Sequence, residues 1–210
     1  MACRTAGTVV EKKHVSFRFK SQLLFQVVLG IVIGSLSCDK AAGKPQIGAK
    51  DLDGHAVDVF AGTNKLVVLL FVSNDCPISN RYTPELIRLH RLYSSKGVSF
   101  FAVHANKDET PESIRRHAEE FHYSFPVLRD PGLDLVKRAK ATVTPEAAVF
   151  RSSGELIYHG RVDNRYVALG QERAVITEHD LEQAILSGLD GKLPQLQFVP
   201  AVGCQLSPRE

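Results

Sequence analysis

The sequence lacks a strong net charge, and it contains no internal repeat or low-complexity stretch. Its 26 Lys and Arg nearly balance its 23 Asp and Glu, so the formal net charge is only +3. This charge is too small and too scattered along the chain to predict a nucleic-acid partner. The 210 residues and the 44% hydrophobic content instead predict one globular domain with an extension.

The sequence also lacks an apolar run long enough to cross a membrane comfortably, which takes about 20 residues. The apolar stretch over residues 23–34 follows a basic start and precedes small residues such as Ser37. This order predicts a cleaved secretory signal peptide or an uncleaved membrane anchor over residues 1–37, followed by a linker over residues 38–48. A lipoprotein that begins at Cys38 is a third alternative. We therefore predict an exported, periplasmic or membrane-anchored protein that touches the membrane only through this segment.

Cysteine is scarce, with four residues in the whole chain. Cys3 and Cys38 belong to the leading segment, which leaves Cys76 and Cys204 in the domain predicted over residues 49–210. In an exported domain, two cysteines can form one disulfide bond.

Metal-binding patterns are also missing. The eight histidines show no spacing typical of a metal site. His104, at the end of a predicted strand, is the one histidine that we consider as a ligand. We therefore expect no cofactor and no resident metal.

The most informative stretch that is present joins a buried strand to a cysteine. Residues 66–72 are short, apolar and rich in Val and Leu, which predicts a strand covered on both faces. Cys76 follows this strand, and residues 80–93 show helical spacing. A thiol at a helix start meets unpaired backbone N–H groups that favour the thiolate, although Asp75 opposes this effect. We expect an accessible reactive thiol; the alternative is a small buried apolar side chain.

The rest of the domain alternates strands and helices, which predicts an α/β fold. Asp53 and Gly54 mark the turn of an opening hairpin, and Thr110 caps a helix that begins at Pro111. The hairpin is predicted over residues 51–60, further strands over 97–104, 125–128, 146–150 and 156–162, and helices over 111–122, 133–141 and 179–189.

Two motifs in this order resemble the thioredoxin fold. In that fold a cysteine motif opens a helix, and a proline eight positions after the first cysteine kinks it; Pro84 stands in that relation to Cys76. Thr144 and Pro145 look like the cis-proline loop that faces the cysteine. Residues 125–132 are similar to the alkyl hydroperoxide reductase and thiol-specific antioxidant branch. The resemblance covers roughly residues 44–204 and implies a thioredoxin-like fold, with a central mixed β-sheet flanked by helices, an N-terminal hairpin and a C-terminal tail.

The chain departs from the thioredoxin pattern at two positions. Ser79 stands where the second cysteine belongs, and Leu70 stands where a buried carboxylate belongs. Ser79 also takes the place of the peroxidatic cysteine in the peroxiredoxin register. If Cys76 is given that role, Ser73 can replace the threonine of the motif, but Leu69 replaces its proline. The chain is most similar to the peroxiredoxin-like redoxins that keep only the first thioredoxin cysteine.

The resemblance implies a thiol–disulfide oxidoreductase that acts on protein or small-molecule thiols and disulfides. In this interpretation the Cys76 thiolate attacks a disulfide, or is oxidised. Cys204 either resolves the mixed species, forms a static bond with Cys76, or does neither. Ser79 either donates a hydrogen bond to the thiolate or caps the helix. Pro145 is expected to be cis and, with Thr144, to shape the substrate face.

Two other functions remain open at this point. One is peroxide reduction, an antioxidant activity implied by the likeness of residues 125–145 to peroxiredoxins. The other is a non-enzymatic binding or copper-delivery module in which Cys76 and Cys204 are soft ligands for Cu(I). The sequence does not predict the oligomeric state.

Overall fold

The computed structural model describes residues 48–206. The predicted signal peptide or anchor over residues 1–37, and all of the predicted linker except Gly48, lie outside them. No helix in the described part of the chain combines the length and the apolar character needed to cross a bilayer.

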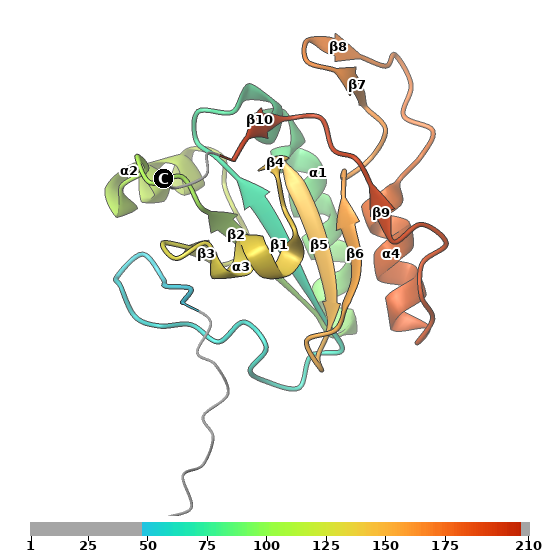
Figure 1. The fold of residues 1–210 in the computed structure, drawn as a ribbon, viewed down its shortest axis with the longest axis horizontal. Helices are drawn as coiled ribbons and strands as arrows, with labels where there is room; N and C mark the ends of the chain where they lie inside the picture. Colours follow the sequence, from blue (N-terminus) through green and yellow to red (C-terminus); the bar gives the residue numbers. More distant parts are fainter. Residues whose placement is uncertain (1–47, 207–210) are drawn as a thin grey trace, which may run out of the picture. The chain divides into compact units, whose positions relative to one another are not determined.

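Strands and helices alternate along the first half of the domain, and short strands dominate the second half (Figure 1). The elements are β1 (Leu66–Val72), α1 (Pro77–Tyr93), the 3₁₀ helix η1 (Ser94–Lys96), β2 (Val98–His104), α2 (Pro111–Glu120), β3 (Val127–Arg129), α3 (Asp134–Ala139), β4 (Val143–Thr144), β5 (Glu146–Arg151), β6 (Leu156–Gly160), β7 (Tyr166–Ala168), β8 (Gln171–Glu172), α4 (Asp180–Leu189), β9 (Phe198–Val199) and β10 (Cys204–Gln205).

A mixed six-stranded sheet forms the centre of the domain, in the order β3-β2-β1-β5-β6-β9. β2 runs parallel to β1 and to β3, whereas β5 is antiparallel to both β1 and β6. All seven residues of β1 are buried, as the apolar run predicts for a central strand. The predicted mixed sheet flanked by helices is confirmed.

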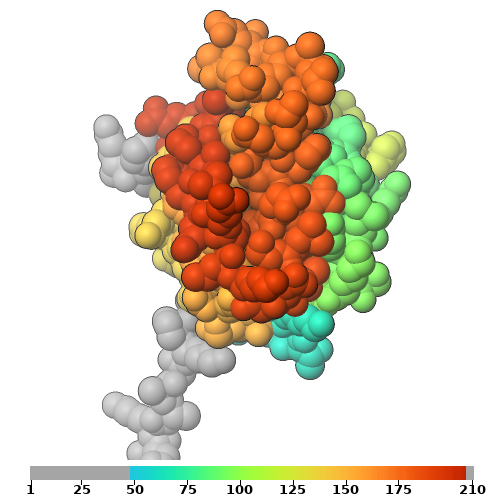
Figure 2. Space-filling model, turned by 90° about the vertical axis from the view of Figure 1, so that its right-hand side faces the viewer, coloured from blue at the N-terminus to red at the C-terminus, as the bar shows by residue number. Residues whose placement is uncertain are grey.

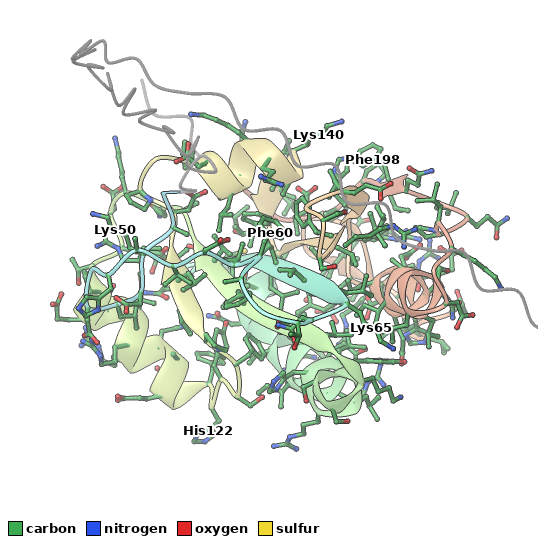
Figure 3. All side chains as sticks on the ribbon, turned by 90° about the horizontal axis from the view of Figure 1, so that it is seen from below. Lys50, Phe60, Lys65, His122, Lys140 and Phe198 are labelled. Atoms are coloured by element: carbon green, nitrogen blue, oxygen red, sulfur yellow. The ribbon has the colours of Figure 1, made fainter. Side chains whose placement is uncertain are left out.

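Successive side chains of β1 point to opposite faces of the sheet and enter two separate cores. Val68 and Leu70 pack in one core together with residues of α1 and α4, such as Leu86 and Ile185. The other core takes the alternate side chains of β1, residues of α3, and Phe60, whose ring meets Phe150 edge to face at 5.4 Å (Figure 3). Burial of each large apolar side chain contributes roughly 1.5–3 kcal/mol. β1 is therefore packed on both faces, and this packing fixes the position of the loop that follows it.

Three expectations about the elements need correction. The opening hairpin over residues 51–60 is reduced to a turn with a single bridge between Lys50 and Ala56. Lys50 also bridges Arg129. β3 is an edge strand, so the backbone groups of Arg129 on the side away from β2 pair with those of Lys50. β3 begins at Val127, two residues later than predicted, and β4, β7, β8, β9 and β10 were not predicted as strands.

Candidate functional site: a buried thiol pair

α1 begins directly after Cys76, which occupies the N-cap position of the helix. Pro77 is the first helical residue, where its missing N–H costs nothing and its fixed φ favours the helix. The Cys76 backbone N–H donates to Ser73 O at 3.3 Å, which turns the chain from β1 into α1. The predicted arrangement of strand, cysteine and helix is present, and Pro84 lies inside α1 as expected.

The proline loop lies against this cysteine. The Thr144–Pro145 peptide bond is cis, as predicted. Cys76 Sγ donates a hydrogen bond to the Thr144 carbonyl oxygen at 3.0 Å. The two motifs that are 68 residues apart in the sequence therefore meet at one point in the fold.

The C-terminal tail brings the second cysteine to the same point. β10 pairs antiparallel with β4, so that Cys204 lies opposite Thr144 and Gln205 opposite Val143 (Figure 1). The Leu206 N–H donates to Thr142 O at 2.9 Å and continues this pairing. Cys204 Sγ lies 2.6 Å from Cys76 Sγ, and both are free thiols. The tail thus holds the two sulfurs at a separation from which a disulfide bond needs only a small movement.

The expectation of an accessible Cys76 is wrong. Its side chain is only 1% exposed, whereas Cys204 is partly exposed. Cys76 and Cys204 pack in the same apolar core, together with Val202 of the tail. The sequence pattern around residue 76 gives no sign of this cover, because the covering strand lies more than a hundred residues away in the chain.

The two thiols have opposite pKa shifts. Burial raises the pKa of Cys76, but hydrogen bonds from the Cys204 thiol and from Ser79 outweigh it, so the net pKa lies below its ordinary value of 9.0. Burial raises the pKa of Cys204, and its hydrogen bond to Cys76 and the charge of that thiolate raise it further, to about 11. Cys76 is therefore the more acidic thiol of the pair, and Cys204 is the less acidic one.

Ser79 lies in the first turn of α1 and does not cap the helix, which has no side-chain cap. It is fully buried, and its Oγ has no hydrogen-bond partner among the described residues. Its backbone N–H and its hydroxyl both lower the pKa of Cys76. Of the two roles expected from the sequence, the cap is therefore wrong, and a hydrogen bond to the Cys76 sulfur stays a prediction.

These shifts predict a thiolate titration in two separated steps. In a Cys3→Ser, Cys38→Ser background, ultraviolet absorbance of the reduced protein should show one thiolate forming below pH 9.0 and a second near pH 11. Replacing Cys204 by alanine should remove the second step and move the first to higher pH, because the thiolate loses a donor. Two thiols that titrate together near their ordinary pKa would contradict this assignment.

A buried carboxylate that the sequence analysis missed supports the loop before Cys76. Glu109 accepts hydrogen bonds from Ser73 Oγ at 3.0 Å and from the Asn74 N–H at 2.6 Å. Its other oxygen pairs with His104 Nδ1 at 3.1 Å. His104 is thus engaged with a carboxylate, and its Nε2 is buried without a partner in the described part of the chain. Nothing in the spacing of Glu109 marks it, because its partners come from the loop after β1 and from the last residue of β2.

A second buried carboxylate holds the proline loop. Glu146, directly after Pro145, accepts from the Thr142 N–H at 2.8 Å and the Val143 N–H at 3.3 Å. Its other oxygen lies 3.3 Å from His159 Nδ1. Its position beside the proline is a signal that sequence reasoning could have used. The carboxylate fixes the strand β4 against which the tail pairs.

Two hollows of different size open beside the thiol pair. A groove of about 590 Å³ runs between the start of α1, at Ile78 and Arg81, and the β7–β8 hairpin, at Tyr166 and Leu169; Cys204 also lines it. A smaller pocket of about 140 Å³ is lined by both cysteines and by Asp75, Asn106 and Gln205. The groove is large enough for a polypeptide segment, and the pocket is large enough only for a small molecule.

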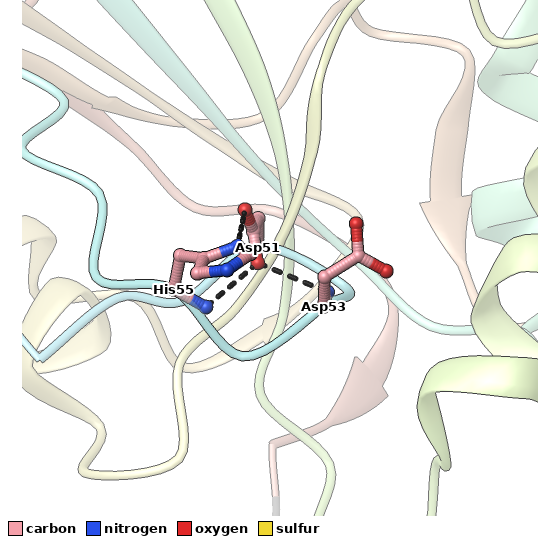
Figure 4. Close-up of side chains that lie close together, drawn as sticks. All are labelled: Asp51, Asp53 and His55. Carbon is pink, nitrogen blue, oxygen red and sulfur yellow. Dashed lines mark hydrogen bonds and ion pairs between the residues drawn. The ribbon is translucent and has the colours of Figure 1, made fainter.

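Metal-ligating side chains gather in two clusters of the described residues, and in one of them, Glu85, His179 and Glu182, both carboxylates pair with Arg88; the other lies at an exposed turn. Asp51, Asp53 and His55 lie close together (Figure 4). Asp51 already accepts hydrogen bonds from the backbone N–H groups of Asp53 and His55 and pairs with the His55 ring at 3.0 Å, so the cluster is a hydrogen-bonded turn. Cys76 and Cys204 are the soft ligands that the described residues bring together, and His104 faces Glu109.

Comparison with known proteins places the chain in a family. The profile of the Redoxin family matches residues 40–185, which is more than half of the chain. The chain belongs to the Redoxin family. This membership confirms the predicted thioredoxin-like fold. The Redoxin match ends before Cys204, so the tail that covers Cys76 lies beyond it.

The chain is also similar to a named relative and to solved structures. The chain is 25% identical over 150 residues to the thiol-disulfide oxidoreductase ResA of Halalkalibacterium halodurans, covering 67% of this chain and 84% of ResA. An uncharacterized conserved protein of Geobacillus kaustophilus superposes with a TM-score of 0.66 at 28% identity, over 76% of this chain and 87% of that one. A hypothetical protein of Sinorhizobium meliloti gives a TM-score of 0.64 at 26% identity, over 75% and 87% of the two chains.

Proposed function

We propose that this Redoxin protein is a thiol–disulfide oxidoreductase whose redox couple is Cys76 and Cys204. The observation that carries the proposal is the 2.6 Å separation of the two sulfurs at the point where α1 begins and the cis-proline loop passes. The ResA relatives, named for this reaction, support it. The partners are protein or small-molecule thiols and disulfides.

The chemistry is a two-electron exchange. In the reduced protein both sulfurs are thiols, and in the oxidised protein they share a disulfide bond. Oxidation of the pair releases two protons and passes two electrons to the disulfide of the partner, which becomes two thiols. Ser79 stabilises the Cys76 thiolate, while Thr144 and Pro145 hold the carbonyl group and the strand that position the two sulfurs.

The proposal includes export. The basic start and apolar stretch before residue 37 support a signal peptide or anchor, followed by a linker over residues 38–48 and the redoxin domain over 49–210. A cysteine pair that cycles through a disulfide also suits an oxidising compartment.

Peroxide reduction is a second candidate, and the small pocket beside Cys76 favours it. The pocket of about 140 Å³ admits a small molecule to a sulfur that the tail otherwise covers. In this reaction the Cys76 thiolate attacks one peroxide oxygen and becomes a sulfenic acid, and the other oxygen leaves as water. The Cys204 thiol then condenses with the sulfenic acid, which forms the disulfide and releases a second water.

One peptide map tests both candidates. The reduced full-length protein is treated either with oxidised glutathione or with hydrogen peroxide, alkylated, digested and mapped without reduction. We expect a Cys76–Cys204 linked peptide after oxidised glutathione, which dithiothreitol then removes. Free Cys76 and Cys204 after that treatment would contradict the thiol–disulfide proposal. A linked peptide that forms with hydrogen peroxide no faster than in a free dithiol would contradict peroxide reduction.

A further inference from the structure

The two sulfurs of the couple differ in the partners that can reach them. Cys204 lines the groove of about 590 Å³ between α1 and the β7–β8 hairpin. Cys76 is absent from the described residues that line this groove, and it is 1% exposed. The pocket through which Cys76 is reached has a volume of only about 140 Å³. A polypeptide thiol can therefore approach Cys204 but not Cys76 while the tail is in place.

We propose that a protein partner is joined to the molecule through Cys204. Cys76 is the sulfur that leaves when a partner dithiol is oxidised, and the one that resolves the mixed disulfide when a partner disulfide is reduced. This reverses one of the alternatives that the sequence left open, in which Cys76 meets the partner and Cys204 resolves the mixed disulfide. The inference rests on the proposed function, because it requires the Cys76–Cys204 couple.

The exchange begins on the oxidised protein. A partner thiolate attacks Cys204 Sγ, a bond forms between the partner sulfur and Cys204, and the Cys204–Cys76 bond breaks. Its electron pair stays on Cys76 as the thiolate. A second partner thiolate then attacks the first partner sulfur, and Cys204 leaves and takes up a proton. The partner dithiol has lost two electrons and become a disulfide, and the protein disulfide has gained them. The reverse sequence reduces a partner disulfide.

The environment of each sulfur suits these roles. In thiol–disulfide exchange, the sulfur whose thiol has the lower pKa leaves faster. Hydrogen bonds from Cys204 and from Ser79 lower the pKa of Cys76, and those from Ser79 do not depend on a Cys204 thiol. Burial and the neighbouring Cys76 raise the pKa of Cys204 to about 11. The buried sulfur is therefore the better leaving group, and the accessible sulfur is the one attacked.

The groove indicates which partner segment fits. Its walls include Ile78 and Tyr166, and Leu169 stands at the tip of the hairpin with 66% of its surface exposed. The hairpin projects at the top of the domain in Figure 2. Arg81 and Glu172 add one charge of each sign, so the groove does not favour a partner segment of either net charge. The occupant that we propose is an extended polypeptide segment with an apolar side chain next to its cysteine.

The test identifies which of the two cysteines the partner thiol attacks in the first covalent step. The full-length protein with Cys3→Ser and Cys38→Ser is oxidised, and the Cys76–Cys204 bond is verified by mapping. It is then mixed with a short peptide that contains one cysteine beside a leucine, acid-quenched, alkylated and mapped. We expect the peptide on Cys204 and the alkyl group on Cys76. A peptide on Cys76, or divided evenly between the two sulfurs, would overturn the proposal. Absence of the Cys76–Cys204 bond before mixing would instead mark failure of the proposed function.

A second measurement tests the groove. Leu169→Ser should slow attack by the leucine-containing peptide by a factor of about three to ten, because an apolar contact is lost. Attack by β-mercaptoethanol should not change. The matched control is Val175→Ser, which alters an equally exposed side chain, 68% against 66%, that does not line the groove. Equal rates for the two variants with the peptide would overturn the assignment of the groove.

Discussion

Replacing Gly203 by alanine is expected to slow formation of the Cys76–Cys204 disulfide by a factor on the order of 100 or more. A β-carbon at residue 203 would lie inside the contact distance of the Thr144 carbonyl group and close to the Pro145 nitrogen. All of these atoms belong to the backbone, so no side-chain rotation relieves the clash. β10 must then leave β4, and Cys204 becomes a thiol on a loose tether instead of one held beside Cys76.

The measurement is the rate of disulfide formation in oxidised glutathione buffer, followed by mass spectrometry. Alkylation of reduced Cys76 by a bulky maleimide should become faster in the same variant, because the tail no longer covers that sulfur. Gln205→Ala is the matched control: its side chain is exposed and its pairing with Val143 uses only the backbone. If Gly203→Ala oxidised as fast as the parent, the docked tail could not be what brings the two sulfurs together.

Replacing Glu109 by alanine is expected to lower the free energy of unfolding by about 3–5 kcal/mol, since each buried polar group left without its partner costs about 1–3 kcal/mol. The change leaves Ser73 Oγ, the Asn74 N–H and His104 without their acceptor in a buried site. Urea denaturation measures the loss. Because Ser73 and Asn74 lead into Cys76, oxidation of the thiol pair should slow as well.

Glu119→Ala is the control, since Glu119 is an exposed glutamate on α2, the helix that follows Glu109. Glu109→Gln should lose less stability, because its amide oxygen can still accept from Ser73 and Asn74. A loss in Glu109→Ala no larger than that in Glu119→Ala would show that the buried network does not stabilise the fold.

The same carboxylate predicts a pH dependence of the wild-type protein. Burial raises the pKa of Glu109, but the hydrogen bond and charge of His104, together with the donors at Asn74 and Ser73, outweigh it and lower the pKa below 4.5. A depressed pKa in the folded state means that the stabilisation is fully present above pH 4.5 and is lost as the pH falls towards the lowered pKa. Urea midpoints of the wild type should fall in that range more steeply than those of Glu109→Gln.

Local sequence patterns predicted the scaffold of this site well. The apolar run of β1 could be read because a strand buried on both faces needs a continuous apolar stretch, and Thr110 with Pro111 fixed the start of α2. The cis-proline at Pro145 was reached through the resemblance to thioredoxins. The prediction of an opening hairpin over residues 51–60 was wrong, because the alternation of residues cannot show that Lys50 pairs with Arg129.

The sequence by itself determined the α/β order of the elements and the position of Cys76 at the start of a helix. It also determined that the domain contains a second cysteine, Cys204. Only the tertiary structure decided that the tail pairs with β4, that Cys204 covers Cys76, and that Glu109 lies beneath the loop. The reason is physical: strands and helix caps follow from neighbouring residues, whereas burial and the shift of a thiol pKa depend on groups that the fold brings from distant parts of the chain.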